Sequence, residues 1–270
     1  MGIGRQRSPD AILRIVPNRS PEFASAVFGR EARVLGVLGG AVMTPVVLGL
    51  DTAGGGAGQP ALLMSCLPGR AMTLSKESGH DWITMAQEIG RTLAEIHRAV
   101  PAGDPSVPSV VFDWLQPDAL GASVEYASSP WRGFWQELQG LAGETEIASD
   151  GFIQRDVRVA DLLWDRVHLR ISGVLGWERA GFGPRGWDLA KARLDATLQC
   201  GGFEPADLVI DAYEAAWGDP VVDRRFWDLA VALSSIEALD VLQRGYAELG
   251  RLDLMQPTLW TRLLEFVRHR

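Results

Sequence analysis

Two aspartates five residues apart are the residues in this sequence whose types and spacing could do chemistry. Asp156 and Asp161 lie in GFIQRDVRVADLLWD, residues 151–165, with apolar residues on both sides of them. An ionised carboxylate can accept a proton from a hydroxyl group, and carboxylate oxygens are ligands that Mg²⁺ prefers. The same two residues could also be solvated loop carboxylates or turn caps.

The spacing of the two aspartates is that of a kinase catalytic loop, which favours the chemical interpretation. Such a loop is followed along the chain by a further metal-binding aspartate. In ISGVLGWERAGFGPRGWDLAKARL, residues 171–194, Gly176 stands where that aspartate is expected. Glycine has no side chain that could bind a metal. The sequence therefore raises the question whether a phosphoryl-transfer site has lost its reaction.

The first part of the chain is predicted to mix strands with one helix. A short strand runs from Asp10 to Pro17, and PEFASAVFGREARVLGVL at 21–38 has apolar residues at helical spacing after a Ser-Pro start. TPVVLGLD and PALLMSCL read as two further strands, separated by the glycine-rich TAGGGAGQ. We expect this smaller lobe to end near Leu67 and to span residues 1–67.

The remainder, residues 68–270, is predicted to be mostly helical. Apolar residues between Gly79 and Val100 recur every three or four positions, as on one face of an amphipathic helix. A second helix is expected in SPWRGFWQELQGLAG and a strand–loop–strand unit over 151–177. Further helices are predicted at about 186–199, 205–217, 223–241 and 257–268. The fold class that follows is α+β.

Composition narrows the partners and the compartment. The net charge of −8 and the pI near 5.1 argue against nucleic-acid and anionic-membrane surfaces, which are bound through Lys and Arg. The longest apolar stretch, from Val34 to Leu50, is too short for a membrane span and contains Pro45. No signal peptide is recognisable, and with only Cys66 and Cys200 a disulfide framework is not expected. The sequence thus predicts a cytoplasmic protein.

The chain resembles the aminoglycoside phosphotransferase and choline kinase family, relatives of the protein kinases. The resemblance is carried, in this order, by AILRIVP, FGREARVL, PALLMSCLPGR, EIGRTLAEIHRAV, the loop at 151–165 and GFGPRGWDLAKARL. In that family a loop of the form HGDxxxxN is followed by a strand ending in IDW. The resemblance implies a two-lobed, protein-kinase-like fold, here with a truncated N-lobe and a mostly helical C-lobe.

The resemblance assigns roles within the loop. It places the family's catalytic aspartate on Asp156 and the metal-binding Asn on Asp161. The preceding His and Gly become Gln154 and Arg155, and IDW becomes Leu-Gly-Trp with Gly176 at its centre. Hard cations accept either Asn or Asp oxygens, so Asp161 could still bind Mg²⁺. The carboxylate missing at Gly176 has no such substitute.

The resemblance also predicts a depleted nucleotide site. The family's nucleotide-anchoring lysine falls on Arg14 or a neighbour, and its partner on the following helix is Glu31. Lysine is rare, since Lys76 and Lys191 stand against 24 arginines. Residues 1–10 are too few for the hairpin that covers the phosphates in the family, and the sequence leaves open whether that absence is natural.

Further residues have expected structural or electrostatic roles. Asp188 is expected to cap the helix that it begins or, from the resemblance, to brace the catalytic loop. Without a metal, the guanidinium groups of Arg155, Arg158 and Arg179 are expected to neutralise the two loop aspartates. Three tryptophans are expected to pack in the core rather than to stack on a base. They are Trp164, Trp177 and Trp187.

Three functions remain open from the sequence. We favour a pseudokinase, a binding or scaffolding module that accepts a small molecule or a peptide or protein partner between the lobes. The first alternative is an active small-molecule phosphotransferase, with Asp156 as base and Asp161, helped by Glu178, as metal ligand; only this alternative requires ATP and Mg²⁺. The second is an enzyme of another reaction class that uses Asp156 or Glu178 as acid or base. The sequence assigns neither the ligand nor the oligomeric state.

Overall fold

A small antiparallel sheet and one helix form the first part of the structure. The computed structural model describes residues 11–16, 20–77, 81–115, 131–145, 147, 149–236 and 238–269. The sheet has the strand order β1–β3–β2, and helix α1 lies between β1 and β2 along the chain. The bounds are β1 (Ala11–Ile15), α1 (Pro21–Leu38), β2 (Val47–Asp51) and β3 (Ala61–Ser65).

Local sequence explains why α1 forms where it does. The Ser20 hydroxyl accepts a hydrogen bond from the Phe23 amide at 3.2 Å, which caps the first turn, and Pro21 suits that turn. Gly39 ends the helix in the left-handed conformation, with φ of 51°. The buried residues recur every three or four positions and face the core, and Glu31 is the one charged residue among them.

Five short strands and three 3-10 turns frame the loop that carries the two aspartates. The second sheet has the order β4–β6–β7, and β5 pairs with β8 in a separate ribbon. The strands are β4 (Arg70–Ala71), β5 (Gly151–Ile153), β6 (Leu162–Asp165), β7 (Arg170–Val174) and β8 (Gly181–Gly183), and the turns are η1 (Asp113–Leu115), η2 (Val159–Asp161) and η3 (Trp177–Arg179). The loop leaves β5 and enters β6, whereas β7 leads to Gly176.

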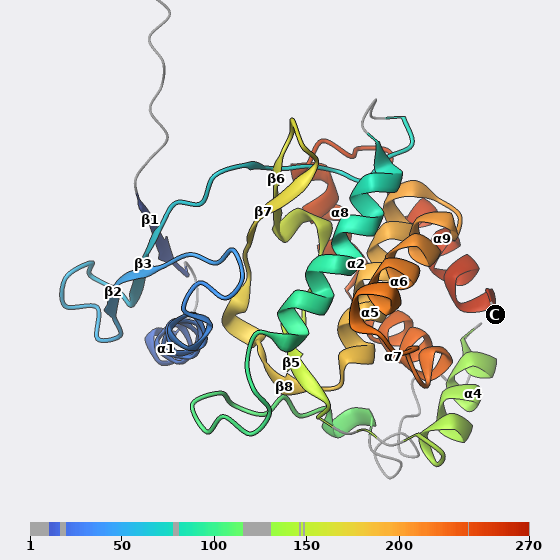
Figure 1. Ribbon diagram of the computed structural model, residues 1–270, viewed down its shortest axis with the longest axis horizontal. Helices are drawn as coiled ribbons and strands as arrows, with labels where there is room; N and C mark the ends of the chain where they lie inside the picture. Colours follow the sequence, from blue (N-terminus) through green and yellow to red (C-terminus); the bar gives the residue numbers. More distant parts are fainter. Residues whose placement is uncertain are drawn as a thin grey trace, which may run out of the picture.

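Helices make up most of the rest of the molecule and lie to one side of the first sheet (Figure 1). They are α2 (Trp82–Arg98), α4 (Arg132–Ala142), α5 (Arg185–Cys200), α6 (Glu204–Trp217), α7 (Arg224–Ile236), α8 (Leu239–Glu248) and α9 (Gln256–Arg268). Helix α5 packs against α2, α6, α7 and α9. None of the described helices is long and apolar enough to cross a membrane.

The structure confirms most of the predicted elements and corrects one. The predicted helix 223–241 is wrong at its end, because α7 stops at Ile236 and α8 begins at Leu239. Between them the Ala238 amide donates to the Ser235 carbonyl at 3.1 Å, a tight turn that interrupts the helical ladder. The three tryptophans predicted to pack in the core are buried there, as expected.

The chain passes from the first sheet to the second between the end of β3 and the start of β4. This passage lies at the boundary predicted near Leu67. The division into lobes at 1–67 and 68–270 stays a prediction.

Candidate functional site

Two buried aspartates of α5 hold the backbone of the loop between β5 and β6. Asp188 accepts hydrogen bonds from the amides of Gln154 at 2.7 Å and Arg155 at 2.8 Å. Asp195 accepts from the Val159 amide at 2.7 Å. Both carboxylates are almost fully buried, so an unsatisfied loop amide or carboxylate here would destabilise the fold. Helix α5 therefore fixes the loop at its beginning and near its end.

The position of Asp188 decides between its two expected roles. Pro184, not Asp188, is the N-cap of α5, and Asp188 lies inside the first turn. The expectation that it caps the helix is wrong. Its contacts with the loop amides are those of the brace that the resemblance implies.

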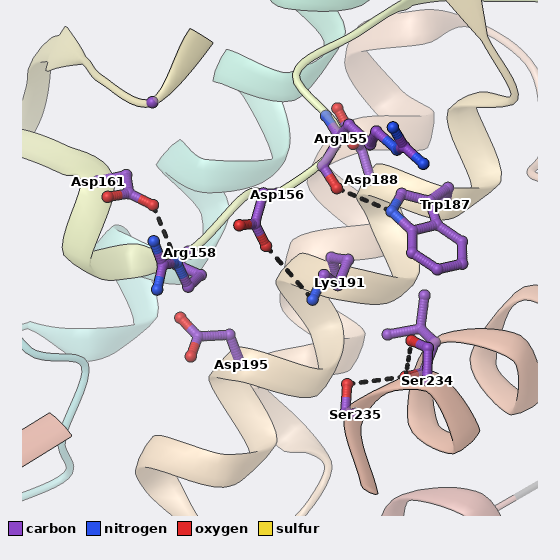
Figure 2. A network of polar contacts seen from close by, with 12 residues as sticks. Arg155, Asp156, Arg158, Asp161, Trp187, Asp188, Lys191, Asp195, Ser234 and Ser235 are labelled. Carbon is purple, nitrogen blue, oxygen red and sulfur yellow. Dashed lines mark hydrogen bonds and ion pairs between the residues drawn. The ribbon is translucent and has the colours of Figure 1, made fainter. Parts of the chain in front are cut away.

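Asp156 faces a lysine across the loop. The Lys191 Nζ atom lies 3.5 Å from Asp156 Oδ1, and Figure 2 shows the two side chains pointing toward each other. The Asp156 amide donates to Gln154 Oε1 at 2.8 Å. Lys191 is a residue of the site that was not predicted from the sequence. Its position three residues after Asp188 on α5, one helical turn along the same face, was the available signal.

Asp161 pairs with an arginine of the same loop. Arg158 Nε donates to Asp161 Oδ2 at 3.0 Å (Figure 2). Burial raises the pKa of the Asp161 carboxyl from 3.8 to about 6; the nearby charge of Asp156 also raises it, and Arg158 opposes the change. The predicted neutralisation of a loop aspartate by arginine is confirmed for this pair.

Arg155 and Arg179 do not take the predicted part in that neutralisation. Within the described ranges neither makes an ion pair with Asp156 or Asp161. The cation at Asp156 is Lys191 instead. The prediction was wrong for these two arginines because it counted charges near the loop in sequence, whereas α5 brings a lysine from 35 residues further along the chain.

The side chain of Gln154 hydrogen-bonds to the backbone at Gly176, the position at which the resemblance expects the family's second metal-binding aspartate. Its Nε2 atom donates to the carbonyls of Leu175 at 3.0 Å and Gly176 at 2.7 Å. Gly176 has φ of 77°, and a Cβ atom added there would lie 3.0 Å from Gln154 Nε2. A side chain at Gly176 would thus meet both a strained backbone and the glutamine amide.

Arg14 and Glu31 form the ion pair that the sequence analysis allowed. Arg14 Nη1 donates to Glu31 Oε2 at 2.6 Å, and the Glu31 side chain is 2% exposed. Burial raises the pKa of the Glu31 carboxyl to about 7; Arg14 opposes this change, and the charge of Glu178 adds to it. Glu178 Oε2 lies 3.8 Å from Arg14 Nη1, so one guanidinium serves two carboxylates.

The described residues contain no group of three His, Cys, Asp or Glu side chains that could hold a metal ion by themselves. A Mg²⁺ ion that bridges phosphates needs only one or two carboxylates, so Asp161 stays a predicted metal ligand. Asp161 and Asp156 each have a cation of the chain as partner.

Comparison with solved structures shows the fold. The chain superimposes on the aminoglycoside phosphotransferase APH(2")-IIIa in its complex with GDP and kanamycin with a TM-score of 0.66 and 16% identity, over 97% of this chain and 88% of that one. APH(3'')-Id from Streptomyces rimosus, in complex with ADP and streptomycin, gives a TM-score of 0.57 at 16% identity, over 82% of this chain and 85% of that one. Choline kinase LicA from Streptococcus pneumoniae gives a TM-score of 0.60 at 13% identity, over 96% of this chain and 86% of that one.

Sequence comparison identifies the family. No curated protein shows significant similarity to the chain. The model of the phosphotransferase enzyme family (APH) matches residues 3–228, which include the Arg14–Glu31 pair, the loop between β5 and β6 and helix α5. The chain therefore belongs to the APH phosphotransferase enzyme family, with a protein-kinase-like fold.

Proposed function

We propose that this protein is a pseudokinase, a binding or scaffolding module that does not transfer phosphoryl groups. The observation that carries the proposal is the pair of hydrogen bonds that the Gln154 side-chain Nε2 atom donates to the Leu175 and Gly176 carbonyls. A kinase needs a carboxylate in this region to hold the metal ion that bridges the transferred phosphates. Here a neutral amide is satisfied by backbone carbonyls, and Gly176 offers no ligand.

The charges around the two loop aspartates support the same conclusion. Asp156 lies beside Lys191, and Asp161 is hydrogen-bonded to Arg158. Each carboxylate has a positive neighbour within 4 Å, and for Asp161 this neighbour offsets part of the cost of burying the charge. A Mg²⁺ ion entering this region would have to displace both pairs and would meet two like charges. Partial charge compensation by the chain itself takes the place of compensation by metal.

The nucleotide-anchoring position adds a third line of support. Arg14 is engaged by Glu31 at hydrogen-bond distance and shared with Glu178. Active protein kinases keep the corresponding Lys–Glu ion pair, so the Arg14–Glu31 pair alone does not argue against nucleotide binding. Glu178 places a second carboxylate at the same guanidinium, with which a nucleotide phosphate would compete. We infer that ATP binds weakly or not at all, and that the ligand of this module is a small molecule or a peptide or protein partner.

The test measures nucleotide binding and turnover together. In titration calorimetry with ATP and Mg²⁺ we expect no heat of binding at micromolar concentrations. ADP release with kanamycin or choline as acceptor should stay at background and should be the same in wild type and Asp156→Asn. Asp211→Asn is the matched control, because Asp211 is an exposed carboxylate on α6 with no ion pair among the described residues.

The active alternative, with Asp156 as base and Asp161 as metal ligand, predicts the opposite pattern. ADP would form above background in wild type and in Asp211→Asn but not in Asp156→Asn. A micromolar dissociation constant for ATP with Mg²⁺ together with that pattern would overturn the pseudokinase proposal.

A further inference from the structure

Three arginines from separate parts of the chain converge beside the loop, on elements that the fold brings together. Arg30 lies on α1, Arg155 in the loop after β5 and Arg179 at the end of η3. Arg30 Nη2 donates to the carbonyl of Arg179 at 3.3 Å and to that of Ala180 at 3.0 Å. We call Arg30, Arg155 and Arg179 the arginine trio.

The segment before η1 links Arg155 to the other two arginines. Arg155 Nη2 donates to the Val111 carbonyl at 3.3 Å. The preceding residue, Val110, donates its amide to the Phe182 carbonyl of β8 at 2.6 Å. A Cβ atom built on Gly181 would lie 3.0 Å from Val110 Cγ2 and 3.2 Å from Arg30 Nη2. The guanidinium groups of Arg155 and Arg30 are therefore anchored on adjacent backbone segments.

No member of the trio forms an ion pair with an Asp or Glu in the part of the chain that the structure describes. Asp156, the carboxylate adjacent to Arg155 in sequence, lies beside Lys191 and acts on Arg155 only from a distance. Figure 2 shows the Arg155 side chain directed away from Asp156. Burial lowers the pKa of Arg155, the charges of Arg179 and Arg30 lower it further, and the charge of Asp156 opposes them. Arg155 is therefore repelled by both other members of the trio.

The backbone at Arg155 is held in a conformation that its residue type disfavours. Its φ is 77°, in the left-handed region that glycine adopts freely. The position is kept by the Arg155 amide bond to Asp188 and by a 2.8 Å hydrogen bond from Trp187 Nε1 to the Arg155 carbonyl. The guanidinium lies 5.1 Å from the centre of the Phe112 ring. Glycine would fit this backbone better, so an arginine here is locally strained, and that strain points to a role for its side chain.

Part of the trio keeps hydrogen-bond donors for a ligand. The Arg179 side chain donates no hydrogen bond to another described residue; only its carbonyl is engaged, by Arg30. Arg179 is exposed to solvent, and Arg30 and Arg155 are half-buried, so a ligand can reach the group from outside. A guanidinium presents five donors in a planar fork that matches the oxygens of a phosphate group.

We propose that the arginine trio binds a phosphate group, in the form of a phosphate monoester dianion. Such an ion offsets the repulsion between Arg155 and the other two guanidinium groups and accepts hydrogen bonds from the free N–H donors of the trio. The proposal names the class of ligand for the binding module proposed above, and in that respect it rests on the proposed function. Phosphate here is bound and not transferred, so neither ATP nor a metal ion is needed.

The test is titration calorimetry at low ionic strength with two probes, inorganic phosphate and a short blocked peptide containing phosphoserine. We expect binding in the millimolar range or tighter in wild type. Arg155→Gly, which suits the left-handed backbone, and Arg179→Gln, at an exposed position, should each weaken binding about tenfold or more. Arg166→Gln is the matched control: Arg166 is exposed in the turn between β6 and β7 and has no ion pair among the described residues.

Each outcome decides the proposal. Tighter binding of the phosphopeptide than of inorganic phosphate supports the trio and identifies a phosphorylated side chain as the source, and equal binding supports a small phosphate monoester. No heat with either probe at 10 mM (about the weakest affinity of interest), or equal losses in Arg166→Gln and Arg155→Gly, would overturn it. If neither probe binds, the proposal that the protein does not turn over ATP still stands. If ATP is turned over, the proposal that the trio binds phosphate still stands.

Discussion

Replacing Asp161 by asparagine should stabilise the protein at neutral and alkaline pH, although the change removes the charge from an ion pair. Burial raises the pKa of Asp161 more than Arg158 lowers it. The ionised carboxylate is therefore less favourable in the folded protein than in the unfolded chain. Asparagine keeps an oxygen that can accept the hydrogen bond from Arg158 Nε and carries no charge to desolvate.

The magnitude follows from the two pKa values. The carboxyl has a pKa of 3.8 in an open chain and about 6 in the fold. The difference is about 2 pH units at about 1.4 kcal/mol each, which gives about 3 kcal/mol as an upper bound. Because the Asp161 side chain keeps 21% exposure, solvent screening reduces this value, and we expect a gain of about 1–3 kcal/mol.

The sign of the pH dependence is opposite to that of a carboxylate stabilised by its partners. Between about pH 4 and pH 6 the folded protein still holds the Asp161 proton that the unfolded chain has released. The folded state binds more protons there, so the free energy of unfolding falls as the pH rises. Below about pH 4 the wild type and Asp161→Asn should be equally stable, and above about pH 6 their difference should be constant.

The assay is urea unfolding followed by tryptophan fluorescence at a series of pH values between 4 and 8. Asp211→Asn, at an exposed carboxylate, serves as the control and should change stability by less than about 0.5 kcal/mol. Glu31, whose pKa is raised to about 7, will contribute a similar fall between about pH 4.5 and pH 7 in all the variants. Only the difference between wild type and Asp161→Asn isolates Asp161.

Two results would refute this reasoning. Destabilisation by Asp161→Asn at pH 8 would mean that the ion pair with Arg158 outweighs the burial of the carboxylate. A wild type that gains stability with millimolar Mg²⁺, and loses the gain in the variant, would mean that Asp161 binds metal after all.

Two further predictions concern the packing of α5. Gly186→Ala should destabilise the fold by about 3 kcal/mol, because the added Cβ atom would lie 2.1 Å from Trp227 Cδ1. The control is Gly245→Ala, on α8 with open space around it, which should be neutral or stabilising. Equal effects of the two substitutions in urea unfolding would contradict the steric argument. Tyr246→Phe should cost about 1–3 kcal/mol, since it removes the hydroxyl that donates to the buried carboxylate of Asp195; unchanged thermal stability would show that this hydrogen bond is dispensable.

Much of the architecture could be predicted from the sequence because its signals are local. The apolar spacing over 82–98 in α2 and the Ser-Pro start of α1 are properties of neighbouring residues, and both elements form where expected. The tight turn after Ile236 gave no strong signal, since the sequence around it has neither glycine nor proline, and the predicted helix ran past it.

The composition of the site depended on contacts between distant segments. The sequence by itself determined that Gly176 offers no metal ligand and that Asp156 and Asp161 stand five residues apart. It could not determine which cations compensate those carboxylates. Lys191 reaches Asp156 only because α5 packs beneath the loop, and its charge acts through space without regard to its distance along the chain.

For Gln154 and Arg155 too, the sequence shows the residue type, whereas the tertiary structure shows the partner of each side chain. The sequence showed that they replace a His and a Gly of the family pattern. Only the tertiary structure decided that the Gln154 amide bonds to the Gly176 carbonyl and that Arg155 joins arginines from α1 and η3. A residue type fixes which hydrogen bonds and charges a side chain can offer, whereas the packing of separate elements fixes which partner receives them.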